Sequence, residues 1–417
     1  MIEDPKAFLR KLFDTAVEAA QPSVRVPAFL PHPPKGRTII AGAGKAGAAM
    51  VQAVEANWDG PLEGLVITRY GHLLPTEQVE VVEASHPVPD EAGHQGALRM
   101  LKLVDGLSAD DLVLFLISGG GSALMTAPAE GITLEEKKEV NRQLLACGAD
   151  IGEINCVRRH LSAVKGGRLA AAAAPARRVA LLISDVPGDH PATIASGPTA
   201  ADPTSRGDAL AIVAKYDLQL SDTVAAYLAS PASETTKPGD PSLEGVENHV
   251  ICAPSQSLEA AAGMAGAAGV RIINLGDLVE GEARDVGRAH AQQALEVAAK
   301  GGGPALIISG GECTVTLRGD GKGGPNTEYL MGLALELNGA DGIHAIACDT
   351  DGIDGAMHNA GAVIGPDTLA RASAAGLGTA AMLADNNAYA YFEALGDLVV
   401  SGPTHTNVND FRAILIG

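Results

Sequence analysis

The chain has 417 residues, of which 46% are hydrophobic and 3% aromatic, and its formal net charge is −20. A chain of this length exceeds what one hydrophobic core usually supports, so we expect two domains. So acidic a surface repels nucleic acid and anionic membranes, which excludes both as partners, and any bound anion needs a locally basic or N–H-rich site.

The five cysteines are scattered and form no C-x-x-C motif, so we expect neither a disulfide framework nor a structural zinc site. The acidic N-terminal residues lack the apolar region of a signal peptide. No run of about 18 apolar residues occurs that could span a bilayer. Together these features predict a cytoplasmic protein.

The first half of the chain alternates between helical and β-rich segments. Residues 4–20 have the apolar spacing of an amphipathic helix. The continuously apolar runs that follow are typical of a parallel sheet covered by helices on both faces. Strands are expected at 37–41, 64–68, 79–83, 111–117 and 178–183, with helices at 44–56 and 90–105.

A polar, proline-rich stretch at 228–247 is typical of a linker or long surface loop. Beyond it, strands are expected near 248–253, 270–275, 304–309 and 343–348, and helices at 255–268, 280–300 and 327–338. We therefore predict two α/β domains with mainly parallel sheets, residues 1–235 and 236–417. Helix 4–20 can pack on either domain.

The hexapeptide Gly42–Gly47, directly after the strand at 37–41, fits two chemistries. Its spacing is the G-x-G-x-x-G dinucleotide fingerprint. A nicotinamide site also predicts an acidic residue at the end of the second strand, and Arg69 stands there instead, although it could accept a 2′-phosphate. Lys45 suits a phosphoryl group in transfer. The pattern leaves both open, with phosphoryl transfer slightly ahead.

Several polar clusters directly follow strands, where helix N-termini converge and ligands bind in parallel sheets. The glycine loop 118–122 has three consecutive glycines, which predict an anion cradle of backbone N–H groups. Two weaker candidates for holding phosphates or a ribose are 309–314 and 323–328. A carboxylate at Asp185 could take a proton or hold Mg²⁺, and Asp189 can reach the same space or close a turn.

Residues 158–168 form the densest basic stretch of this acidic chain. On a helix, Arg158, Ser162 and Lys165 would share a face suited to a carboxylate or phosphate, although such a run is often only a solvated face. The segment 349–355 lacks the spacing of an EF-hand calcium loop, but magnesium or nucleotide contact stays open. The polar turn at 402–410 fits a helix cap or a ligand contact equally well.

Eight motifs occur in order and together closely resemble the glycerate 2-kinases of the MOFRL-domain type, over about residues 5–415. They are Ala41–Ala46, Ser118–Ser122, Arg159–Gly167, Ser184–Asp189, Ile194–Thr199, Gly310–Glu312, Asp349–Gly352 and Gly402–Asn407. The resemblance implies ATP-dependent phosphorylation of D-glycerate to 2-phosphoglycerate with Mg²⁺ or another divalent cation. It also implies a Rossmann-like first domain and an active site in the cleft between the domains.

On this resemblance and the residue chemistry we assign expected roles. Lys45 and Asp185 are the catalytic candidates, and Asp185 and Asp351 are the metal candidates. Cofactor contacts are expected from a larger set: Gly44, Ser118, Gly119, Gly120, Gly121, Ser122, Gly310, Gly311, Glu312 and Asn326. Substrate contacts are expected from Arg159, Lys165, Asp189 and Asn407.

Two alternatives stay open beside the kinase. Some members of the family carry the label hydroxypyruvate reductase, which predicts NAD(P)H oxidation without ATP. A non-catalytic nucleotide or metabolite sensor predicts binding without turnover. The sequence also leaves open whether the chain forms a homodimer and whether Asp185 or Asp189 is the base.

Overall fold

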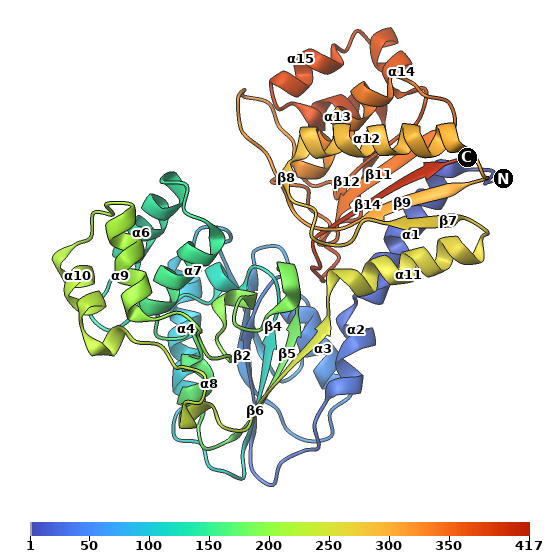
Figure 1. Ribbon diagram of the computed structural model, residues 1–417. Helices are drawn as coiled ribbons and strands as arrows, with labels where there is room; N and C mark the ends of the chain where they lie inside the picture. The colour runs from blue at the N-terminus through green and yellow to red at the C-terminus, as the bar shows by residue number, and fades with distance from the viewer. Residues whose placement is uncertain (1) are drawn as a thin grey trace. The chain divides into compact units, whose positions relative to one another are not determined.

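The chain forms two six-stranded sheets, each in its own compact unit, as a computed structural model describes for residues 2–417 (Figure 1). The N-terminal unit spans Pro22–Cys252, and the C-terminal unit combines residues 2–21 with Ala253–Gly417. This organisation confirms the predicted α/β fold class, and the parallel pairing expected of both sheets is found throughout the N-terminal sheet but, among the described residues, in only one pairing of the C-terminal sheet.

The sheet of the N-terminal unit is entirely parallel and has the order β3-β2-β1-β4-β5-β6. This is the strand order of a doubly wound dinucleotide-binding fold, in which the order reverses between β1 and β4. Ligands bind beyond the carboxyl ends of the strands at that reversal. The strands are β1 (Thr38–Ala43), β2 (Glu63–Arg69), β3 (Glu80–Ala84), β4 (Leu112–Ile117), β5 (Arg177–Ile183) and β6 (Val246–Cys252).

Helices cover this sheet and also form a separate group beside it. Strands β1 and β4 are buried along their whole length because helices pack on both faces. Helices α6, α7, α9 and α10 gather at one side of the sheet around their own apolar cluster (Figure 1). The helical segments are α2 (Pro22–Arg25), η1 (Val26–Phe29), α3 (Gly47–Glu55), α4 (Glu91–Val104), α5 (Gly121–Leu124), α6 (Leu134–Ala146), α7 (Ile151–His160), α8 (Arg168–Ala172), η2 (Pro187–Asp189), η3 (Ile194–Ser196), α9 (Arg206–Lys215), α10 (Asp222–Ala229), η4 (Pro231–Ser233) and η5 (Pro241–Leu243).

The sheet of the C-terminal unit is mixed, with the order β13-β12-β11-β14-β9-β7. Only the β7–β9 pair is parallel among the pairings of this sheet in residues 2–417, whereas β14 lies antiparallel between β11 and β9. The strands are β7 (Arg271–Asn274), β9 (Ala305–Ser309), β11 (Ile343–Asp349), β12 (Gly361–Ile364), β13 (Leu398–Val399) and β14 (Asp410–Ile416), and a separate two-stranded sheet pairs β8 (Gly281–Glu282) with β10 (Cys313–Thr314).

Alternating residues of β14 bury two different faces of this sheet. Ile414 and Ile416 pack with α12 and α13, and Ala413 and Leu415 pack with α1 and α11. Helix α1 therefore belongs to the C-terminal unit, although it lies at the start of the chain. The helices are α1 (Pro5–Ala19), α11 (Pro254–Ala267), α12 (Ala283–Lys300), α13 (Pro325–Leu337), α14 (Thr368–Ala374), α15 (Thr379–Ala384) and α16 (Ala388–Leu395).

The polar stretch at 228–247 packs onto the N-terminal unit. Thr235 is buried and donates to Asp202 Oδ2 at 3.0 Å, and Thr236 Oγ1 donates to Gly166 O at 2.6 Å. Strand β6 then pairs with β5. Because these contacts hold the stretch in place, the two units divide between Cys252 and Ala253, whereas the sequence pattern suggested a division at 235/236. Among residues 2–417, no helix is both long and apolar enough to cross a bilayer.

Candidate active site at the carboxyl edge of the first sheet

Three loops meet at the carboxyl edge of the parallel sheet, after β1, β4 and β5. The backbone N–H of Lys45 donates to Gly119 O at 2.8 Å, and the N–H of Ala46 donates to Ser118 Oγ at 3.0 Å. These bonds join the hexapeptide turn to the glycine loop 118–122 at the point where the strand order reverses. The sequence prediction that both loops lie at one sheet edge is met.

The glycines of the hexapeptide serve the protein's own packing. A Cβ on Gly44, whose φ is +148°, would lie 2.0 Å from Ser118 Oγ. A Cβ on Gly47 would have its nearest neighbouring atom 3.6 Å away, so this position tolerates a side chain. The N–H groups of Lys45, Ala46 and Gly47 all donate within the protein. In a dinucleotide fold the third glycine allows close helix–strand packing, and the helix N-terminus holds the pyrophosphate. Here Gly47 has room for a side chain and the N–H groups are already bonded, so neither feature supports a dinucleotide site.

The glycine loop 118–122 is fixed by its neighbours. Gly120 has a left-handed φ of +80°, and a Cβ there would lie 3.1 Å from His86 Cδ2 and 3.4 Å from Lys45 Cγ. Lys45 and His86 therefore flank this glycine. At the other end of the loop, Ser122 Oγ lies 2.8 Å from Ser196 Oγ, which connects the loop to the segment after β5.

The segment after β5 has strained backbone. Asp189, Ala195 and Ser196 have φ between 51° and 62°, a region that non-glycine residues rarely occupy. One carboxylate oxygen of Asp189, Oδ1, is buried without a hydrogen-bond partner among the described residues. Strain and unsatisfied polar atoms cluster at functional sites. Asp185 stands at the carboxyl end of β5, where its half-buried side chain lies close to the same edge.

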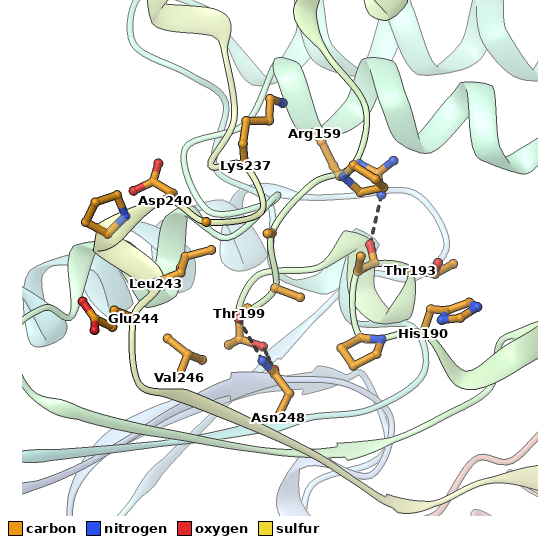
Figure 2. Close-up of a pocket in the computed structure, with 17 residues that line it drawn as sticks. Arg159, His190, Thr193, Thr199, Lys237, Asp240, Leu243, Glu244, Val246 and Asn248 are labelled. Atoms are coloured by element: carbon orange, nitrogen blue, oxygen red, sulfur yellow. Dashed lines mark hydrogen bonds between the residues drawn. The ribbon is translucent and has the colours of Figure 1, made fainter.

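The basic stretch does not form one helix face, because α7 ends at His160. Arg159 donates from Nη1 to Ala192 O at 3.0 Å, and its Nε lies 3.1 Å from Asp202 Oδ2. Arg159 lines a cavity of about 890 Å³ together with residues of the segments 190–203 and 237–248 (Figure 2). The guanidinium of Arg159 therefore mainly stabilises the segment 190–203. Lys165 lies on a different cavity and donates to Ser122 O at 2.7 Å.

The other cofactor candidates lie in the C-terminal unit, around a buried polar network. Arg412 donates from Nη1 to Gly310 O at 2.7 Å and forms an ion pair with Asp410. Asn326 donates to Asp410 Oδ1 at 2.6 Å, and its own Oδ1 lacks a hydrogen-bond partner among the described residues. Glu312 is exposed beside Gly311. The network fixes Gly310 and Asn326, and the contact of these candidates with a cofactor stays a prediction.

Asp354 was not singled out from the sequence, although it organises the start of α13. Its carboxylate accepts from the N–H groups of Asn326 and Thr327, both at 2.9 Å, so it caps the helix from a distant loop. Burial raises the pKa of Asp354 to about 6 in spite of these bonds. A cap from a residue 27 positions away has no local sequence signal.

The two metal candidates lie in different units. Asp351 and Asn407 are both buried, and Asp351 Oδ1 accepts from Ile353 N at 2.8 Å. Over residues 2–417, no group of three or more His, Cys, Asp or Glu side chains is arranged to hold a metal. Mg²⁺ in phosphoryl-transfer sites commonly takes one or two carboxylates plus substrate phosphates and waters, so a single carboxylate at Asp185 or at Asp351 is compatible with such a site.

The sequence patterns did not single out Lys137 or His86, which line a cavity together with Gly120 and Ser122. Both lie close to the glycine loop in space, but Lys137 belongs to α6 and His86 follows β3. The capping box of Thr133 and Glu136 marks the start of α6 in the sequence. Nothing in that signal indicates that Lys137 faces a cavity.

Known families and proteins resemble this chain over most of its length. A domain of unknown function, DUF4147, matches residues 8–229, and the MOFRL family matches residues 305–410. A D-glycerate 2-kinase of Thermotoga maritima is 38% identical, with 99% of each chain covered. A putative hydroxypyruvate reductase of Agrobacterium vitis is 53% identical, over 98% of this chain and 94% of that protein. The crystal structure of a Thermotoga maritima glycerate kinase superposes with a TM-score of 0.89 at 38% identity, covering 99% of each chain.

Proposed function

This chain belongs to the family that joins a DUF4147 domain to a MOFRL domain and includes glycerate 2-kinases, and from that premise we propose that it phosphorylates D-glycerate to 2-phosphoglycerate with ATP. The observation that carries the proposal is the position of Lys45. It follows β1 at the strand-order reversal, beside Gly120 and bonded through its backbone to Gly119.

Phosphoryl transfer requires mainly positioning and charge stabilisation. We propose that the Lys45 ammonium neutralises charge on the transferring phosphoryl group and that the glycine loop 118–122 contacts its oxygens. Asp185 would orient or deprotonate the 2-hydroxyl of glycerate. A divalent cation, when bound with ATP, supplies charge neutralisation at the phosphates, and Asp185 is the residue that would hold it.

Further contacts are proposed for the remaining candidates. The C-terminal residues Gly310, Gly311, Glu312 and Asn326 would contact the nucleotide, with Asp351 as a second metal candidate. Arg159, Lys165, Asp189 and Asn407 would contact the substrate. Asp189 is supported by its buried Oδ1, which lacks a hydrogen-bond partner among the described residues. Arg159 already donates to Ala192 O and forms an ion pair with Asp202, which weakens the case for it.

The alternative of hydroxypyruvate reduction rests on the name of the Agrobacterium vitis relative and on the fingerprint spacing. Arg69 at the end of β2 disfavours NAD but could accept the 2′-phosphate of NADP. Two features oppose either nicotinamide: Gly47 has room for a side chain, and the N–H groups of Lys45, Ala46 and Gly47 bond within the protein. Neither feature is expected of a pyrophosphate site.

One purified sample can test both activities in parallel coupled assays. We expect ADP release that requires both D-glycerate and Mg²⁺, with no NADH or NADPH oxidation in the presence of hydroxypyruvate. Oxidation of either nicotinamide with hydroxypyruvate and without ATP would overturn the kinase proposal. Binding of ATP without turnover of D-glycerate would favour a sensor.

A further inference from the structure

A small cavity of about 170 Å³ in the N-terminal unit has a strongly basic lining. Five of its side chains are basic and, among its described residues, none is acidic, although the whole chain carries a net charge of −20. The five are His86, Lys137, Lys138, Arg158 and Lys165. We call this the basic cavity.

Lys137 differs from the other lysine and arginine side chains of the basic cavity in the hydrogen bonding of its ammonium group. Lys138 forms an ion pair with Glu135 at 2.9 Å, Arg158 donates to Asn141 Oδ1 at 2.5 Å, and Lys165 donates to Ser122 O. Lys137 is only 8% exposed, and its Nζ has no hydrogen-bond partner among the described residues. A buried charge without compensation is costly, so an anion entering the cavity would relieve that cost.

The basic cavity adjoins the candidate active site. Gly120 forms part of its wall, and a Cβ on that glycine would lie within 3.4 Å of both His86 and Lys45. A volume near 170 Å³ admits a three-carbon acid and is too small for a nucleotide. The size, charge and position of the cavity therefore fit the carboxylate end of a small phosphoryl acceptor.

We propose that Lys137 binds the carboxylate of the hydroxy-acid substrate in the basic cavity and that this binding takes up a proton. The inference rests on the proposed function for the identity of the acid. Burial, followed by the charges of Arg158 and Arg168, lowers the pKa of Lys137 to about 7. The pKa of the neighbouring Lys165 is also lowered, by burial and by the charges of Lys137 and Arg158.

The direction of the pH effect follows from the charges that face Lys137. Arg158 and Arg168 are cationic neighbours on other elements, and Lys165, His86 and Lys138 also line the cavity. A bound carboxylate opposes the effect of the cations. The carboxylate raises the pKa of Lys137, so above pH 7 binding must add a proton. Affinity then falls as pH rises, by up to about tenfold per pH unit.

Isothermal titration calorimetry of D-glycerate tests the proposal on the whole protein. At pH 8, in two buffers of different ionisation enthalpy, we expect uptake approaching one proton for the wild type. Lys137→Met retains the apolar stem and should raise Kd and KM at least tenfold, change kcat much less, and abolish proton uptake. Lys102→Met, at an exposed position of α4, is the matched control and should behave as the wild type.

The outcomes separate this inference from the proposed function. Wild-type affinity and proton uptake in a folded Lys137→Met variant would overturn the inference even if D-glycerate is phosphorylated. Absence of proton uptake by the wild-type protein at pH 8 would overturn it without any variant. If the wild type does not phosphorylate D-glycerate but binds D-glycerate or D-lactate through Lys137 with proton uptake, the proposed function fails and the carboxylate site stands.

Discussion

Lys45 and Gly119 are joined by a backbone hydrogen bond of 2.8 Å, from the N–H of the lysine to the carbonyl of the glycine. The bond connects the turn after β1 to the loop after β4, two strands that are neighbours in the sheet but far apart in the chain. Because it uses only backbone atoms, the lysine side chain is not needed for the loops to meet.

Substitution of Lys45 by alanine should therefore remove activity and leave the fold intact. We expect kcat for D-glycerate phosphorylation to fall about 10²–10³-fold, because a charge-stabilising group at a transferring phosphoryl contributes a few kcal/mol. ADP release measures the loss, and circular dichroism and thermal melting check the fold. Turnover near that of the wild type would remove Lys45 from the mechanism.

The two glycines Gly44 and Gly47 should differ sharply in their tolerance of alanine. Gly44→Ala would bring a Cβ to 2.0 Å from Ser118 Oγ at a φ of +148°, so we expect a loss of about 2–4 kcal/mol in the free energy of unfolding. Gly47→Ala meets nothing closer than 3.6 Å and should change it by less than about 1 kcal/mol. Denaturant unfolding of both variants is the measurement, and equal destabilisation would contradict the packing argument.

Asp185 and Asp189 can be separated by asparagine substitutions. Asp185→Asn should lower kcat about 10²–10⁴-fold if this carboxylate acts on the substrate hydroxyl. Asp189→Asn keeps a side chain that tolerates the left-handed φ of 55°, so it should raise KM with a smaller effect on kcat. Steady-state kinetics in D-glycerate distinguish the two, and the reverse order would assign the base to Asp189.

Protonation of His290 should make the C-terminal unit sensitive to acid. This buried side chain pairs with Tyr329 Oη at 2.9 Å, and burial, followed by the charge of Arg412, lowers the pKa of His290 to about 4. The unfolded chain, with a histidine pKa near 6.5, binds the proton more readily between pH 4 and 6.5. Stability therefore falls as pH drops through that range, by up to about 3 kcal/mol from this group.

Denaturant unfolding at pH 7 and pH 4.5 tests the histidine prediction. His290→Gln keeps a hydrogen-bonding side chain but cannot be protonated, so its free energy of unfolding should fall less than that of the wild type between the two pH values. His249→Gln, at a side chain that is 37% exposed, serves as the control and should retain the wild-type pH dependence. An unchanged pH dependence in His290→Gln would exclude this histidine as the cause.

Local patterns in the sequence predicted most strands and several helices, because the signals are themselves local. The strand expected at 111–117 is β4 at Leu112–Ile117, and the helix expected at 90–105 is α4 at Glu91–Val104. The polar stretch at 228–247 was a different case: its composition is that of a linker, but Thr235 and Thr236 bond back to Asp202 and Gly166. Amino-acid composition carries no information about hydrogen bonds between residues that are far apart in the chain.

The residues of the candidate site fall into the same two groups: those that local patterns predict and those that depend on contacts between distant parts of the chain. Local patterns were enough to identify the loops that follow strands, including those of Lys45, Ser118 and Asp185. These loops come together because the carboxyl ends of parallel strands meet at one edge. Contacts in the folded chain show that Ser118 leaves no room for a side chain at residue 44, that Arg159 forms an ion pair with Asp202, and that Lys137 faces a basic cavity. These relationships depend on contacts between residues far apart in the chain or on the enclosure of a charge, which no local pattern encodes.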